Sequence, residues 1–137
     1  MNLHKLLCAR AEASHPVRVG LIGAGKFGAM FLAQARLTTG MHILGIADLN
    51  VARARQTLRT VGWAEERFSA VSFDAAFKSG ATHITDNAEQ LIQADGLEVL
   101  IDATGDPAVG IRHCLKAIDQ GLHIVMVNVE ADVVAGP

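Results

Sequence analysis

The sequence has few aromatic residues: its 137 residues include no tyrosine, one tryptophan and five phenylalanines. It also lacks an excess of charge, because 12 basic and 14 acidic side chains leave a formal net charge of −2. Proteins that bind nucleic acid through its phosphates need a basic surface, and those that bind single strands stack the bases on aromatic rings. We therefore expect no nucleic-acid partner.

Cysteines and long apolar runs are also scarce. The two cysteines, Cys8 and Cys114, are too few for a disulfide framework, and we interpret both as reduced thiols. No stretch approaches the roughly 20 apolar residues that span a bilayer, and the first 15 residues lack the apolar core of a signal peptide. We therefore expect a cytoplasmic protein without a membrane partner. Apolar residues nevertheless make up 50% of the chain, which excludes a disordered protein.

Apolar segments of strand length alternate with segments of helix length. We predict strands over residues 17–22, 42–47, 83–85, 98–103 and 123–127. Helices are expected over residues 3–13, 26–37, 51–60, 88–94 and 107–120, with a loop over 63–69 and a short helix after Ser72. This alternation is typical of right-handed βαβ crossovers. The predicted fold class is α/β, a doubly wound parallel sheet in three layers.

Two of these helices carry apolar residues at helical spacing, which predicts the faces that they bury. The helix over 26–37 is expected to turn inward Phe27, Met30, Phe31 and Ala35. The helix over 107–120 is expected to turn inward Ile111, Cys114, Leu115 and Ile118.

A glycine-rich turn, Gly23-x-Gly25-x-x-Gly28, directly follows the first apolar strand and opens a helix. In this context the first glycine permits a tight turn, the second lets the backbone approach a pyrophosphate, and the third allows close packing of helix on strand. The pyrophosphate would lie on free N–H groups at the positive end of the helix. This motif predicts a Rossmann dinucleotide-binding domain over residues 17–137, preceded by a helical extension over 1–16. The cofactor contacts expected in the turn are Gly23, Ala24, Gly25, Lys26, Phe27 and Gly28.

A carboxylate follows the second strand: Asp48 lies twenty residues after Gly28. At that place it can accept hydrogen bonds from the adenosine ribose hydroxyls, which favours NAD and repels the additional phosphate of NADP. Arg53 and Arg55, on the following helix, are interpreted first as a solvated face. Arg53 turned inward would offset the repulsion, so it is also a cofactor candidate, and both NAD and NADP stay open.

Two further polar segments follow the fourth and fifth strands, at the edge where open α/β sheets bind ligands. In the first, Thr104 and Gly105 are expected beside the cofactor, while Asp106 and Pro107 start a helix. In the second, Asn128 would contact the cofactor. Glu130 and Asp132 are the candidates for orienting a substrate or for acid–base catalysis, although they would equally serve as helix caps.

The histidines form no pattern of metal ligands. His113 has no second ligand three or four residues away on its helix face, so a zinc site with Cys114 is not expected. His42, His83 and His123 lie at or near strand starts, away from the cofactor edge. We interpret these histidines as structural, and we expect no metal.

With these motifs, the chain resembles the N-terminal NAD(P)-binding domain of the homoserine dehydrogenase-like oxidoreductases. The likeness is greatest to the branch with a C-terminal SAF domain, which includes enzymes similar to 1-deoxy-D-xylulose 5-phosphate reductoisomerase (DXR-like). The resemblance covers nearly the whole chain and is most specific over residues 17–28, 101–110 and 126–137. In homoserine dehydrogenases proper a lysine follows the asparagine, whereas here Val129 follows Asn128. The segment is closer to the DXR-like branch, whose members are expected to use NADPH.

The resemblance implies hydride transfer between a nicotinamide and a small carbonyl or hydroxy substrate. The acid–base residues that such chemistry needs normally come from a second domain, so we expect this chain to be the N-terminal part of a longer enzyme and inactive alone. The apolar surface for such a domain would also allow homo-oligomers to form. The alternatives are a non-catalytic dinucleotide-binding or partner-docking module and, on fold analogy alone, a domain for coenzyme A or flavin.

Overall fold

A five-stranded parallel sheet forms the middle of the molecule; the computed structural model describes residues 2–127, and all counts refer to that range. The order across the sheet is β3-β2-β1-β4-β5. The strands are β1 (Val17–Ile22), β2 (Met41–Ala47), β3 (His83–Thr85), β4 (Val99–Asp102) and β5 (His123–Met126). Successive strands are added first on one side of β1 and then on the other, so the strand order reverses beside β1. Open α/β sheets bind their ligands at this kind of switch point.

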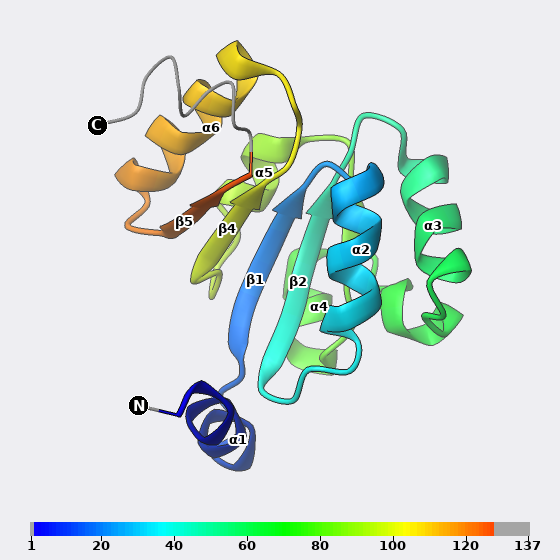
Figure 1. Ribbon diagram of the computed structural model, residues 1–137, viewed down its shortest axis with the longest axis vertical. Coiled ribbons are helices and arrows are strands. Elements are labelled where there is room, and N and C mark those ends of the chain that lie inside the picture. The colour runs from blue at the N-terminus through cyan, green and yellow to red at the C-terminus, as the bar shows by residue number, and fades with distance from the viewer. Residues whose placement is uncertain (1, 128–137) are drawn as a thin grey trace.

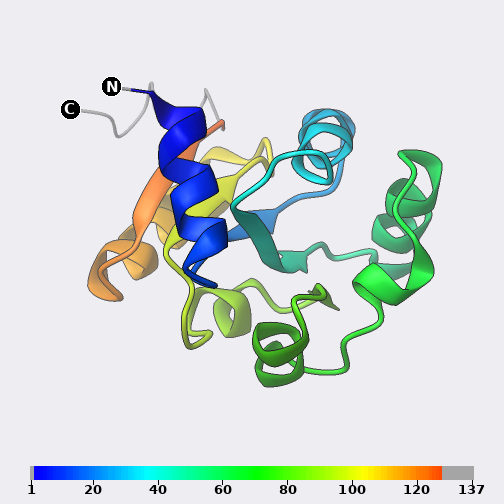
Figure 2. The ribbon, with the colours of Figure 1, turned by 90° about the horizontal axis from the view of Figure 1, so that it is seen from below.

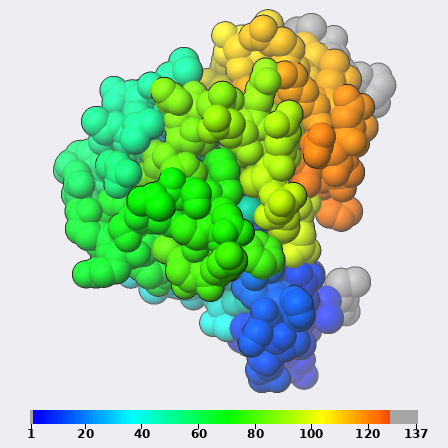
Figure 3. Space-filling model, turned by 180° about the vertical axis from the view of Figure 1, so that it is seen from behind, coloured from blue at the N-terminus to red at the C-terminus, as the bar shows by residue number. Residues whose placement is uncertain are grey.

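Helices cover both faces of the sheet (Figures 1 and 3). One face carries α2 (Lys26–Ala35) and α3 (Val51–Thr60), and the other carries α4 (Phe73–Ser79), α5 (Ala88–Ile92) and α6 (Pro107–Asp119). In Figure 3 the green α4 and α5 lie over the back of the sheet, next to the orange α6. The predicted doubly wound, three-layer architecture is confirmed.

Four of the five helices that cover the sheet begin at a side-chain cap. Asn50, Ser72, Asn87 and Asp106 each accept a hydrogen bond from a backbone N–H in the first turn of the helix that follows. Such caps satisfy N–H groups that have no partner inside the helix. All four were predicted helix starts, and the strand ends agree with the predictions to within one residue.

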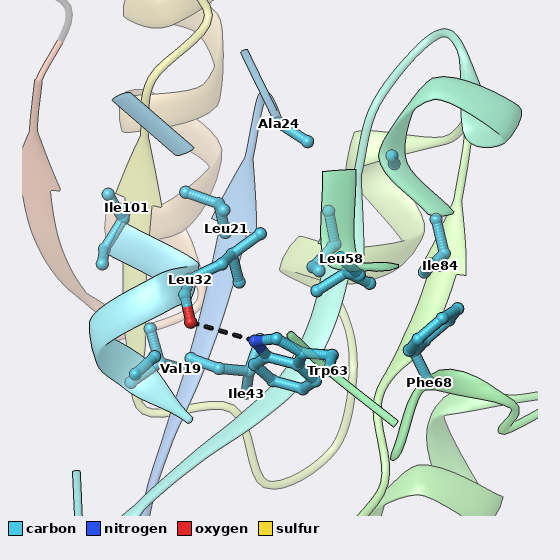
Figure 4. Packing of buried hydrophobic residues seen from close by; sticks show 13 residues of the cluster. Val19, Leu21, Ala24, Leu32, Ile43, Leu58, Trp63, Phe68, Ile84 and Ile101 are labelled. Atoms are coloured by element: carbon cyan, nitrogen blue, oxygen red, sulfur yellow. Dashed lines mark hydrogen bonds between the residues drawn. The ribbon is translucent and has the colours of Figure 1, made fainter. Parts of the chain in front are cut away.

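The larger core cluster lies between the sheet and α2 and α3 (Figure 4). Trp63 packs there, and its indole N–H donates to the carbonyl oxygen of Leu32 at 2.9 Å, so the ring is buried without losing its hydrogen bond. The segment predicted as a loop over 63–69 contains a short 3₁₀ helix, η1 (Glu65–Phe68). The fully buried Phe68 at its end joins η1 to the same cluster.

The predicted buried faces of two helices are partly wrong. In α2 the buried residues are Gly28, Leu32 and Ala35, while Phe27 and Met30 are exposed. In α6 they are Gly110 and Ala117, while Leu115 and Ile118 are exposed. The buried face of each helix thus differs from the predicted one: in α2 only Ala35 of the four predicted residues is buried and Leu32 joins it, and in α6 none of the four predicted residues is buried.

Helix α1 (Leu3–Glu12) lies at the amino ends of the strands, as Figures 1 and 2 show. Arg10 ties it to the sheet by donating to both carboxylate oxygens of Glu98, at 2.8 and 3.0 Å. None of its residues is buried. The carboxyl ends of the strands, at the opposite edge, are therefore left clear of α1. In the part of the chain described, no helix combines the length and the apolar character needed to cross a membrane.

Candidate functional site

The turn between β1 and α2 lies at the carboxyl end of the central strand. Gly23 has φ 95°, and a Cβ there would lie 2.7 Å from the carbonyl oxygen of Ala103. Gly28 is buried in the first turn of α2, where a Cβ would lie 2.5 Å from the carbonyl oxygen of Gly23. Other side chains would be strained or would collide at these positions. The tight turn and close helix packing predicted for these two glycines are confirmed.

Gly25 differs from the other two glycines. Its φ is −77°, which any residue adopts, and no described heavy atom beyond its two chain neighbours lies within 4 Å of the position that its Cβ would take. Nothing within the described chain therefore requires glycine there. Gly25 is also the N-cap of α2, and no side chain of residues 2–127 caps this helix. The open space and the uncapped N–H groups at a positive helix end fit a diphosphate.

Asp48, immediately after β2, is a buried carboxylate with four short contacts. Oδ2 accepts the N–H of Ala24 and Oδ1 accepts the N–H of Asn50, both at 2.8 Å. Nη2 of Arg53 donates to the two oxygens at 3.0 and 2.9 Å. Burial by itself raises the pKa of Asp48, but the hydrogen bonds from Arg53, Asn50 and Ala24 outweigh it and hold the pKa below its ordinary value. Asp48 is therefore an ionised acceptor joined to the glycine-rich turn.

Two of the three arginines of α3, Arg53 and Arg55, lie in different places. Arg53 is the third residue of the helix, where its side chain reaches back over the end of β2 to Asp48. Arg55 is directed instead toward the carbonyl oxygen of Phe68, at 3.5 Å. Both interpretations hold for Arg53: its side chain is 58% exposed, as expected of a solvated face, and its guanidinium also forms charge-assisted hydrogen bonds to the buried Asp48.

A second buried carboxylate ends β4. Asp102 is 1% exposed, and its Oδ1 accepts both the N–H and the hydroxyl hydrogen of Thr104, at 3.0 and 2.9 Å. Its Oδ2 lies 2.9 Å from Nδ1 of His113 on α6. Burial by itself raises the pKa of Asp102, but the hydrogen bonds from His113 and Thr104 outweigh it and lower the pKa. The turn residue Thr104 is thus held by Asp102.

This pairing of Asp102 with His113 was not predicted, since His113 was interpreted as structural and Asp102 was given no partner. The sequence contained one signal for it. A carboxylate at the end of a fully buried strand needs a hydrogen-bonding partner, and the helix that follows such a strand packs back on it. His113 is one of the few polar residues of α6 that are not exposed.

A cleft of about 770 Å³ lies along the carboxyl ends of β1, β2 and β4. Its lining brings together five of the residues discussed so far: Gly23, Asp48, Arg53, Thr104 and His113. It also includes the start of α5 from Asp86 to Glu89, where only a helix was predicted. Because Asp86 directly follows β3, the cleft runs past the ends of four neighbouring strands, from β3 to β4.

Some predicted site residues do not line this cleft. Lys26 and Phe27, in the first turn of α2, are exposed, and Gly105 lies in the turn after β4 with φ 75°. The other residues outside the lining are Ala24, Gly25 and Gly28 of the glycine-rich turn. The candidates Asn128, Glu130 and Asp132 lie outside the described residues. In residues 2–127 no group of three or more potential metal ligands occurs.

Comparison with known proteins gives a family match and one curated relative. The family model for "Homoserine dehydrogenase, NAD binding domain" matches residues 19–134. The homoserine dehydrogenase of Emericella nidulans is 32% identical over 124 residues, which cover 84% of this chain and 32% of that protein. The chain thus spans about a third of the length of this relative.

Solved structures with the same fold come from more distant proteins. Myo-inositol dehydrogenase from Lactobacillus casei, in complex with NAD(H) and myo-inositol, superposes with a TM-score of 0.58 at 19% identity, covering 81% of this chain and 28% of that one. A variant of the 3-ketoreductase KijD10 from Actinomadura kijaniata, in complex with TDP-benzene and NADP, gives 0.57 at 15% identity, covering 81% and 29%. At these identities the similarity shows a common fold.

Proposed function

The chain belongs to the family of homoserine dehydrogenase NAD-binding domains, and from this premise we propose that it is the cofactor-binding part of an NAD(P)-dependent oxidoreductase. Its cofactor would lie along the carboxyl edge of the sheet, with the diphosphate on the glycine-rich turn. Family membership favours this function over a non-catalytic docking module, for which the described residues offer no comparable site.

The observation that carries the proposal is the unexplained space at Gly25. Gly23 and Gly28 are required by the chain's own backbone, whereas Gly25 has an ordinary φ and open surroundings. Glycine at the uncapped end of α2 is required only if a ligand approaches the backbone closely. A diphosphate does so, because it binds the N–H groups of the first helical turn.

The residues around Asp48 support NAD as the preferred cofactor. Asp48 is an ionised acceptor at the end of β2, where the adenosine ribose would lie, and ribose hydroxyls are hydrogen-bond donors. Arg53 neutralises this carboxylate and is itself 58% exposed, so it remains available to a phosphate. NAD preference with residual use of NADP follows from this arrangement. Structural neighbours in complex with NAD(H) and with NADP are consistent with either cofactor.

The substrate would be a small carbonyl or hydroxy compound, with hydride transfer supplied by the bound nicotinamide. We propose that residues 17–137 form the cofactor domain after a helical extension, and that a second domain completes the substrate site. Glu130 and Asp132 would orient the substrate or move a proton, and Asn128 would contact the cofactor. Homoserine itself is less well supported, because Val129 stands where homoserine dehydrogenases have a lysine. The two free cysteines agree with a cytoplasmic setting.

Thermal unfolding with NAD, NADH, NADP and NADPH tests the proposal. A ligand at about 100 times its dissociation constant stabilises the folded state by about 2.7 kcal/mol, which corresponds to several degrees for a domain of this size. Gly25→Asp should remove that stabilisation, because its carboxylate would occupy the diphosphate position, while the melting temperature without ligand stays near that of the wild type.

The matched control is Gln34→Asp, which adds the same carboxylate to the exposed far end of α2. It should leave the ligand-induced shift intact. If none of the four dinucleotides stabilises the wild type, or if Gly25→Asp responds as the wild type does, the proposed function is wrong.

A further inference from the structure

The Asp102–His113 pair determines which ring nitrogen of the histidine carries the hydrogen. Asp102 is an ionised carboxylate and can only accept hydrogen bonds. Its Oδ1 takes both hydrogens of Thr104, and its Oδ2 faces Nδ1 of His113 at 2.9 Å. The hydrogen therefore lies on Nδ1, and in the neutral ring Nε2 carries the lone pair.

The second ring nitrogen is presented to the cleft. Nδ1 faces the buried Asp102, so Nε2 lies on the far side of the ring, and His113 lines the cleft with a side chain that is 12% exposed. Residues 2–127 provide no hydrogen-bond partner for Nε2, although the atom is not sealed from solvent. It is thus an oriented acceptor without a donor in that range, and a hydroxyl group of a ligand can supply the donor.

The order of the strands indicates which hydroxyl this is. Asp48 ends β2, the glycine-rich turn ends β1 and the Asp102–His113 pair lies at the end of β4; these three strands are neighbours in the sheet. Neighbouring strands are about 4.8 Å apart, so the three groups follow one another along the cleft. A dinucleotide has the same order: adenosine ribose, diphosphate, second ribose.

We propose that Nε2 of His113 accepts a hydrogen bond from a hydroxyl of the nicotinamide-side ribose, and that Asp102 positions the ring for this contact. The inference rests on the proposed function, because it needs a dinucleotide in the cleft. It adds a residue on α6 to a cofactor site that the sequence motifs place in the turns after the strands.

Two substitutions of His113 separate ligand binding from structural support. His113→Asn keeps an amide donor near the position of Nδ1 and loses the acceptor at Nε2. His113→Gln places an amide near Nε2 and loses the donor close to Asp102. Affinity is measured for ADP, ADP-ribose and NADH, because only the last two contain the second ribose.

We expect His113→Asn to melt close to the wild type and to bind ADP-ribose and NADH about five- to tenfold more weakly, the usual effect of one hydrogen bond, with unchanged affinity for ADP. His113→Gln should melt earlier and retain more of its affinity for ADP-ribose and NADH than the asparagine variant.

Unchanged binding of ADP-ribose and NADH by His113→Asn would overturn the inference and leave the proposed function standing. Equal weakening for ADP would also overturn it, because the contact would then lie outside the second ribose. Failure of the wild type to bind any of the three probes would instead reject the proposed function itself.

Discussion

The two buried carboxylates at the ends of β2 and β4 are stabilised by different kinds of partner. Asp48 and Asp102 are both buried and ionised, and they lie on either side of the central strand. Asp48 is balanced by Arg53, a permanent cation whose side chain is 58% exposed. Asp102 is held by His113, whose side chain is 12% exposed.

This difference has a physical consequence for each pair. When a partner is lost, an exposed guanidinium returns to water at little cost, whereas a buried imidazole and a buried turn keep unsatisfied hydrogen bonds. The pair at β2 is therefore suited to exchange its contacts with a ligand. The pair at β4 is suited to hold a turn and a ring in one position.

The largest effect on stability is expected from Asp102→Ala. The variant leaves the Thr104 N–H, the Thr104 hydroxyl and His113 Nδ1 without their acceptor, so the free energy of unfolding should fall by about 2–4 kcal/mol. Urea denaturation measures the loss, with Asp95→Ala, at an exposed aspartate, as the control. A loss below about 1 kcal/mol would mean that the hydrogen bonds to Asp102 contribute little to the stability of the fold.

A smaller loss is expected from Asp48→Ala, because Arg53 can be solvated again. The N–H of Ala24 still loses its acceptor, so the free energy of unfolding should fall by about 1–2 kcal/mol in the same assay. Affinity for NADH should fall as well. A loss equal to that of Asp102→Ala would contradict the contrast drawn between the two pairs.

The pH dependence of stability follows from the direction of both shifts. Because the pKa of each carboxyl is lower in the folded state, the unfolded state binds more protons near pH 4, and stability rises with pH there. The contribution is complete above the ordinary carboxyl pKa, about pH 4, and is lost as the pH falls through the lowered values. In urea denaturation between about pH 6 and 3, the free energy of unfolding of Asp102→Asn should fall less steeply with falling pH than that of the wild type. An equal fall in both proteins would contradict a lowered pKa of Asp102 in the folded state.

The smallest stability effect is expected from Arg53→Ala, at about 1 kcal/mol, because the guanidinium is largely solvated but the buried Asp48 keeps only its two backbone donors. Its affinity for NADPH should nevertheless fall about tenfold relative to NADH, since a charge-assisted contact to the additional phosphate is lost. Arg55→Ala, on the same helix and directed away from the cleft, is the control. Equal effects of the two variants would show that Arg53 acts only through overall charge.

The buried faces of α2 and α6 were not predictable from apolar periodicity. Periodicity identified α2 and α6 as amphipathic, but it ranked Phe27 and Leu115 above glycine and alanine as buried residues. The core is contacted instead by Gly28 and Leu32 of α2 and by Ala117 of α6, and at Gly28 a Cβ would collide with the carbonyl oxygen of Gly23. Hydrophobicity alone does not reveal the distance between two packed elements.

Local chemistry determined much of this protein from the sequence alone. Strand and helix segments, their caps and the turns at Gly23 and Gly28 depend on neighbouring residues, and the place of Asp48 depends on a spacing of twenty residues within one βαβ unit. The tertiary structure decided the strand order, the pairing of Arg53 with Asp48 and the pairing of Asp102 with His113. These depend on how α3 and α6 lie against the sheet, and only the packed molecule places a carboxylate and its partner at hydrogen-bonding distance.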